Sequence, residues 1–282
     1  MKSPIVLLAL FSLVTFTPAR TLSTQVQPQQ SPPAQGASAK EPPKYTKEQI
    51  EEIKKENAKA QSMNALIKQA NDAISAHNWQ DAIAPLQQLI AADPNNWQYY
   101  SGLGDAQMNL GQYAQAVDTY KKGIQAAEGN AAVGTQDSSP DLAKKKAGEG
   151  HMLTALGNAY LKLHKNDEAV AAYTRAAAMD PNPALAYFNL CATQYNTGNT
   201  DGAMEACDKA IAADPNKADA YFIKGSLLIA ASKTDKTGKV IAPPGTAEAL
   251  NKYLELAPNG AHVKDVKEML EYIGAKISDK SR

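Results

Sequence analysis

The chain has 282 residues, of which 44% are hydrophobic, 21% charged and 6% aromatic, so it is long enough for one or more folded domains. Lysine plus arginine and aspartate plus glutamate number 29 each, which leaves no formal net charge. This balance gives no overall electrostatic basis for binding nucleic acid or an anionic membrane, and we expect no nucleic-acid partner.

Residues 1–19 have the pattern of an export signal. Lys2 is positively charged, residues 5–16 are largely apolar, and residues 17–19 are an exit segment before Arg20. The apolar run is too short for a comfortable membrane span. We expect cleavage and export to a bacterial periplasm or the medium, with no membrane span afterwards. The alternatives are an uncleaved signal anchor or a buried helix.

Residues 20–44 are rich in glutamine, serine, proline and alanine and have no periodic apolar face. Such a segment buries too little apolar surface to offset the entropy of ordering, so we predict a disordered linker. A proline-rich recognition segment is the alternative.

Residues 45–62 are predicted to form an N-terminal helix. Thr46 with Gln49 has the spacing of a capping box. Ile50 and Ile53 open a stripe with alternating steps of three and four residues, which continues through asparagines and alanines to Ile74. We interpret the stripe as one long helix leading into the next elements, and dimerisation through this helix as the alternative.

A 34-residue period organises the rest of the chain. Leu156-Gly157, Ala169 and Pro181 return 34 residues later as Leu190-Cys191, Ala203 and Pro215, and Ala82 returns as Ala116. Each period contains two amphipathic helical patterns, and proline closes the second because it cannot continue a helical ladder. The expected repeats occupy 63–128 (two repeats), 150–217 (two repeats) and 218–258 (a fifth).

Two insertions interrupt the period. From Ala116 to Ala169 there are 53 residues, 19 more than one period, so residues 129–149 are an insertion, either a loop or a helix extension from Pro140. From Pro215 to Pro258 there are 43, nine more than a period, which places a loop at 232–245. Residues 259–282 are predicted to form a capping helix and a tail.

Leu156-Gly157, Tyr160, Ala169, Tyr173, Ala176 and Pro181, repeated in part by Leu190, Ala203, Ala210 and Pro215, resemble the pattern of the tetratricopeptide-repeat (TPR) family. The resemblance implies an all-α, right-handed α-solenoid of about five TPR helix pairs, with the N-terminal helix and the capping helix at its ends. It implies a scaffold that binds a protein or peptide partner, and no catalysis.

In TPR proteins the first helix of each repeat lines a concave groove, so the resemblance implies a groove built from these helices. An amide both donates to and accepts from a peptide backbone, and aromatic rings are frequent binding anchors. The expected groove residues are Asn71, Asp105, Asn109, Asn158, Lys162, Phe188, Tyr195, Asn196 and Phe222.

Cys191 and Cys207 are the only cysteines, one in each helix of the same repeat. Neighbouring antiparallel helices satisfy the distance that a disulfide needs, and an exported chain meets an oxidising compartment. We favour a disulfide, with two buried thiols as the alternative.

No pattern in the sequence points to an enzyme. The four histidines are scattered without ligand-like spacing, and Gly102-x-Gly104 lies in a helical pattern rather than at a strand-to-helix turn. We therefore expect no catalytic residues, no metal site and no cofactor.

Overall fold

A computed structural model of the protein describes residues 45–129 and 140–277. The predicted signal peptide, residues 1–19, and the predicted linker, residues 20–44, lie outside the described residues. So do residues 130–139 of the first predicted insertion.

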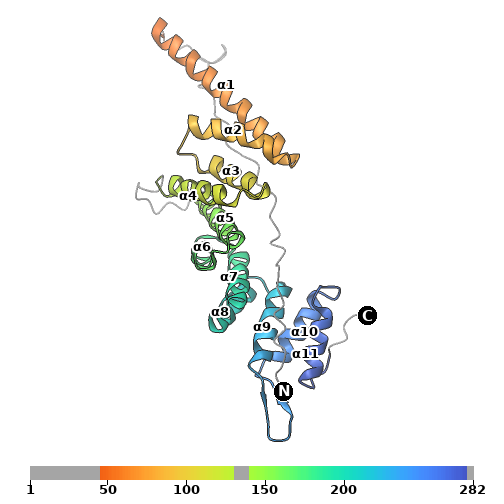
Figure 1. Cartoon of the computed structure of the whole chain (residues 1–282). Helices are drawn as coiled ribbons and strands as arrows, with labels where there is room; N and C mark the ends of the chain where they lie inside the picture. Colours follow the sequence, from red (N-terminus) through yellow and green to blue (C-terminus); the bar gives the residue numbers. More distant parts are fainter. Residues whose placement is uncertain (1–44, 130–139, 278–282) are drawn as a thin grey trace, which may run out of the picture. The chain divides into compact units, whose positions relative to one another are not determined.

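The described helices fall into two compact units, one N-terminal and one C-terminal (Figure 1). In the N-terminal unit each helix packs against the next one along the chain. Its helices are α1 (Lys47–Ser75), α2 (Trp79–Ala92), α3 (Trp97–Asn109) and α4 (Tyr113–Gly129).

Helix α1 is continuous through the predicted boundary at residue 62, so the N-terminal helix and the first helix of repeat one are a single element. The predicted capping box is confirmed. Gln49 N donates to Thr46 Oγ1 at 3.2 Å, and Thr46 N donates to Gln49 Oε1 at 2.9 Å. These two bonds satisfy donors that a helix start otherwise leaves without partners.

Apolar side chains spaced three and four residues apart form the core of the N-terminal unit. One face of α1 packs on α2, and α2 packs on α3. The buried cluster contains Met63, Ile67, Ala70, Ile74, Ala82, Leu86, Leu89, Tyr99, Leu103 and Ala106.

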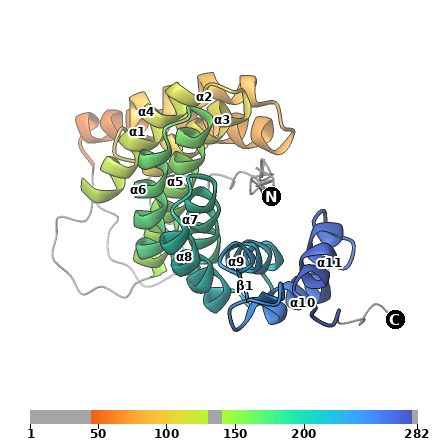
Figure 2. The same ribbon diagram turned by 60° about the horizontal axis from the view of Figure 1, so that its bottom comes forward.

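The C-terminal unit contains three antiparallel helix pairs and a final helix that packs on the last pair (Figure 2). Helix α5 begins at Pro140, so part of the predicted insertion 129–149 extends the first helix of repeat three. The helices are α5 (Pro140–Lys162), α6 (Asn166–Met179), α7 (Ala184–Asn196), α8 (Thr200–Ala213), α9 (Ala218–Ala230), α10 (Thr246–Leu256) and α11 (Val263–Tyr272).

An Asp-Pro-Asn sequence ends the second helix of three repeats in the same way. Helices α2, α6 and α8 stop at the residue before Asp93, Asp180 and Asp214. The carboxylate of each aspartate accepts a hydrogen bond from the backbone N–H two residues later, at 2.9–3.3 Å. Proline excludes further helix, and the aspartate organises the turn that follows.

The turn between the two helices of a pair requires a left-handed residue. Gly111 and Gly198 occupy it with φ of 73° and 79°, and His77 and His164 occupy the same register with φ of 58°. Two of the four histidines therefore have a structural place in turns, which agrees with their lack of ligand-like spacing.

The predicted loop 232–245 contains a short antiparallel hairpin of strands β1 (Lys233–Thr234) and β2 (Val240–Ile241). Its register pairs Lys233 with Ile241 and Thr234 with Val240. The described residues thus form five helix pairs and one further helix, and the predicted all-α repeat architecture is confirmed.

Candidate functional site

In the helix pairs α3–α4 and α5–α6 a glycine of the first helix faces a tyrosine 16 positions later in the second. A Cβ atom on Gly104 would lie 2.4 Å from the Tyr120 ring, and one on Gly157 would lie 2.5 Å from the Tyr173 ring. Glycine is needed at both positions because the two helix backbones approach closely over a flat ring. In the pair α7–α8 the same two positions hold the cysteines.

The tyrosine hydroxyl of two pairs binds the residue that follows the glycine. Tyr120 Oη donates to Asp105 Oδ1 at 2.7 Å, and Tyr173 Oη donates to Asn158 Oδ1 at 2.6 Å. Burial raises the pKa of both tyrosines, and the neighbouring Asp105 carboxylate raises that of Tyr120 further. Both hydroxyls therefore remain protonated donors at neutral pH.

These bonds change the interpretation of two predicted groove residues. Asp105 is 2% exposed and Asn158 is 8% exposed, and each accepts from the tyrosine of its own helix pair. The geometry assigns them to the packing between the two helices instead of an open surface. We do not propose them as partner contacts.

Phe222 also lies in the interior. Its ring is 2% exposed and stacks on His262, with ring centroids 3.9 Å apart and planes inclined by 5°. Nearby, Ser226 Oγ of α9 lies 4.0 Å from Met269 Sδ of α11. The connection to α11 and α11 itself cover this part of α9, so Phe222 holds the final helix in place.

Helix α7 carries three of the candidate residues that remain accessible in the C-terminal unit. Phe188 and Tyr195 are half-buried, and Asn196 is exposed at the end of the helix. The Lys217 ammonium lies 5.2 Å from the centre of the Phe188 ring, a cation–π contact. A partner that reaches Phe188 would meet this lysine as well.

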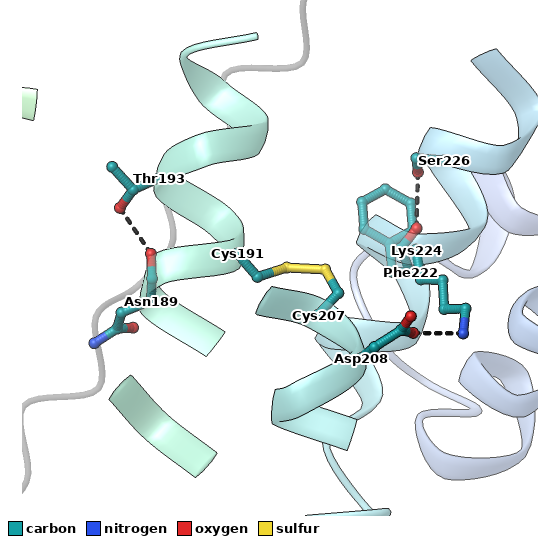
Figure 3. Close-up of a disulfide and its surroundings, with 8 residues drawn as sticks. All are labelled: Asn189, Cys191, Thr193, Cys207, Asp208, Phe222, Lys224 and Ser226. Atoms are coloured by element: carbon teal, nitrogen blue, oxygen red, sulfur yellow. Dashed lines mark hydrogen bonds and ion pairs between the residues drawn. A yellow bond between two sulfur atoms is a disulfide. The ribbon is translucent and has the colours of Figure 1, made fainter. Parts of the chain in front are cut away.

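Asn189 is a candidate that the sequence analysis did not select. It is 7% exposed, and its Nδ2 has no hydrogen-bond partner among the described residues. Figure 3 shows Asn189 and Thr193 on the side of α7 that points away from Cys207. A buried amide that lacks a partner is costly and indicates an unseen water or ligand. The signal in the sequence is a polar residue between Phe188 and Leu190.

We define the α7 face as a set of residues on one side of the helix, at spacings of three, four and seven. It consists of Leu185, Phe188, Asn189, Tyr195 and Asn196.

The other predicted groove residues are dispersed. Lys162 is exposed at the last position of α5. Asn71 is half-buried on α1, in the N-terminal unit. Asn109, also in that unit, is exposed, and its Nδ2 donates to Asp105 O of its own helix at 2.8 Å. The predicted set therefore divides between the two units.

A disulfide joins Cys191 of α7 to Cys207 of α8, with Cα atoms 5.0 Å apart and both residues fully buried. The bond lies on the side of α7 opposite to Asn189 (Figure 3). It fixes α7 against α8, while an ion pair of 2.6 Å from Lys224 to Asp208 connects α9 to α8. The α7 face therefore lies on a helix whose position is fixed by a covalent bond to α8.

Within residues 45–129 and 140–277 no group of three or more histidine, cysteine, aspartate or glutamate side chains is arranged to hold a metal ion. In the same part of the chain no helix combines the length and apolarity needed to cross a membrane.

Stacked antiparallel helix pairs with a recurring small–large contact define a helical-repeat protein. Residues 67–131 and 154–218 each match the model of the tetratricopeptide repeat. These two segments of the chain are tetratricopeptide repeats, as its 34-residue period predicts.

Solved structures of TPR proteins share the fold. The crystal structure of MamA protein is 21% identical, with a TM-score of 0.52 over 72% of this chain and 94% of that one. MamA (41-end) from Desulfovibrio magneticus RS-1 is 18% identical, with a TM-score of 0.52 over 71% and 97%. YrrB, described as a TPR protein with an unusual peptide-binding site, is 21% identical, with a TM-score of 0.51 over 71% and 88%. A comparison with curated protein sequences gives no significant match.

Proposed function

We propose that the protein is an exported scaffold whose C-terminal unit binds an extended segment of a partner protein along the α7 face. The observation that carries this proposal is the buried Asn189 Nδ2, which has no hydrogen-bond partner among the described residues and lies on the helix that also carries the half-buried rings of Phe188 and Tyr195. The Nδ2 is covered in the free chain, so the Asn189 side chain turns outward before it donates to a backbone carbonyl of the partner, while Phe188 and Tyr195 pack against side chains of the partner.

Two further findings support the proposal. TPR proteins are interaction scaffolds, and the similar protein YrrB has a peptide-binding site according to its description. The disulfide supports export, because such bonds persist mainly in oxidising compartments.

The test begins with a peptide selected from a random phage-displayed library with the full chain as bait. The affinity of the synthetic peptide is then measured by fluorescence anisotropy for the parent chain and its variants. We expect Tyr195→Ala to weaken binding by about 30-fold, the effect of losing a hot-spot aromatic. We expect Asn189→Ala to weaken it by roughly three- to tenfold, the effect of one hydrogen bond.

Thermal unfolding separates binding from folding in this test. Asn189→Ala leaves the unfolding temperature nearly unchanged, because the removed Nδ2 makes no hydrogen bond to the described residues. Tyr272→Ala is the matched control, since Tyr272 is 56% exposed and lies outside the α7 face. Equal affinity of Tyr195→Ala, Asn189→Ala and parent would refute the α7 face as the binding surface.

A second candidate function is self-association through the free part of α1. Helix α1 has 29 residues and α2 has 14, so α1 extends about 20 Å farther at 1.5 Å per residue (Figure 1). Its buried residues begin at Ala60. Before that point, Ile50 is 42% exposed and Ile53 is half-buried on the same stripe.

A second copy of the chain, running antiparallel, fits this segment. Residues 47–52 carry one lysine and three glutamates (net −2), and residues 54–59 carry three lysines and one glutamate (net +2). Antiparallel pairing places each acidic half beside a basic half. In a parallel arrangement the second copy would continue along α1 past Ala60. There α2 already covers the stripe, so the two copies would collide.

Sedimentation equilibrium of the full chain tests this candidate. We expect the mean mass of the parent to rise above 30.1 kDa, or the mass of the processed chain, as concentration increases. The double variant Ile50→Glu/Ile53→Glu should stay monomeric, because charge replaces the apolar stripe. Gln87→Glu/Gln88→Glu, which adds the same two charges at exposed positions of α2, should still associate. A concentration-independent monomer mass for the parent would exclude the candidate.

A further inference from the structure

The connection between α9 and α10 carries a surface that the helical repeat itself does not require. The β1–β2 hairpin projects away from the helices of the C-terminal unit (Figure 1). Lys233, Lys236 and Lys239 are exposed, and Ile241 is 55% exposed. A loop that only joined two helices would not need an exposed isoleucine and three lysines.

The turn of the hairpin is ordered by one side chain. Asp235 Oδ1 accepts from Thr237 N at 2.8 Å, Thr237 Oγ1 at 2.7 Å and Lys239 N at 3.0 Å. Asp235 N donates to Lys239 O at 2.9 Å, and Gly238 supplies the left-handed residue with φ of 85°. The hydrogen bonds from Thr237 and Lys239 also lower the pKa of the Asp235 carboxyl. The loop is therefore preorganised without packing against the core, which reduces the entropy lost on binding.

The hairpin is locally basic in a chain without net charge. Residues 232–245 contain three lysines and one aspartate, a net charge of +2. Across the described residues none of the three lysines forms an ion pair, and Asp235 is committed to the turn. Their charges remain available to a partner.

The register places charge and apolar surface together. Lys233 lies directly opposite Ile241, so the two side chains share one face of the hairpin. Lys239 precedes Ile241 by two residues, the spacing at which strand side chains return to the same face. This face therefore offers ammonium groups beside an exposed branched side chain.

We propose that this hairpin face binds an acidic segment of a partner protein that carries an apolar side chain among its carboxylates. The carboxylates pair with the lysines, and the apolar side chain packs on Ile241. An anionic membrane fits less well, because the tip that would reach a bilayer first is Lys236-Thr237-Gly238, while Ile241 lies at the base. This surface is separate from the α7 face.

The probe is a fluorescent 12-residue peptide of alternating glutamate and serine with one central leucine, titrated with the full chain at low salt. We expect Lys233→Gln/Lys236→Gln/Lys239→Gln to weaken binding by about tenfold, since each exposed ion pair contributes only modestly. Ile241→Ser should weaken it by roughly threefold, the effect of partial apolar burial. The control Lys122→Gln/Lys165→Gln/Lys267→Gln removes the same charge at exposed positions elsewhere and should retain binding.

Asp235→Ala distinguishes an ordered site from general attraction to positive charge. The substitution raises the net charge of the hairpin from +2 to +3 but removes the acceptor that holds the turn. An ordered site predicts weaker binding, whereas charge alone predicts tighter binding. The proposal is overturned by tighter binding of Asp235→Ala, or by equal losses in the hairpin and control triple variants. It is equally overturned if the hairpin lysines govern binding to phosphatidylglycerol vesicles and not to the peptide.

Discussion

Reduction of the Cys191–Cys207 disulfide is expected to lower the free energy of unfolding of the C-terminal unit by up to about 3 kcal/mol. The bond closes a loop with a sequence separation of 16 residues and joins two helices that pack face to face. Its main effect in the loop-entropy description is to restrict the unfolded chain. Cys191 and Cys207 stand where the neighbouring pair has Gly157 and Tyr173. Two reduced cysteines fill less space between the helices than glycine and tyrosine do.

The measurement is urea unfolding of the full chain with and without a phosphine reductant, followed by circular dichroism. Both sulfur atoms are fully buried, so the protein must be reduced while unfolded and then refolded, with free thiols counted before the measurement. The double variant Cys191→Ala/Cys207→Ala serves as the control and should show no response to reductant. A parent with two counted thiols and an unchanged midpoint would show that the bond contributes nothing to stability.

The second large effect is expected from Gly157→Ala, which should destabilise the C-terminal unit by about 1–3 kcal/mol. The added Cβ would lie 2.5 Å from the Tyr173 ring. The ring is fully buried and its hydroxyl is bound to Asn158, so it cannot move aside without breaking that bond. Alanine is normally favoured over glycine in a helix by about 1 kcal/mol, which makes a loss of stability diagnostic.

A double-mutant cycle with Tyr173→Ala isolates this contact. In the Tyr173→Ala background the added methyl group meets no ring, and Gly157→Ala should become neutral or stabilising. Gly129→Ala is the matched control, since a Cβ at that position has nothing within 4 Å. Equal effects of Gly157→Ala in both backgrounds would refute the ring contact as the cause.

The fold was largely predictable because its local signals repeat. An Asp-Pro pair at the end of three second helices, a left-handed residue in the turn within a pair and a glycine–tyrosine contact each recur in several repeats, and each has a local physical cause. The first insertion was harder to predict, since its composition fits both a loop and a helix extension and α5 in fact begins at Pro140. The hairpin was predicted only as a loop, because two-residue strands carry too little periodicity to detect.

The candidate site was less predictable because exposure depends on partners far away in the sequence. Phe222 lies on a first helix like Phe188, but His262, forty positions later, covers it. Asp105 and Asn158 each directly follow the glycine that faces the second helix. At this position a side chain can point either into the groove or toward the second helix. The tyrosine hydroxyl 15 residues later decides the outcome. Asn189 was missed because only the structure shows that its amide is buried without a partner.

The position of the disulfide also affects how the unit loses its structure. A repeat protein behaves as a one-dimensional array in which each helix pair is coupled only to its nearest neighbours. The bond lies inside one pair, α7–α8, and the helices on either side of that pair are joined through it. When the disulfide is formed, the stable pair α7–α8 couples the unfolding of α5–α6 to that of α9–α11. When the disulfide is reduced, α7–α8 becomes the least stable pair of the array. Hydrogen exchange should then show that α5–α6 and α9–α11 unfold independently of each other.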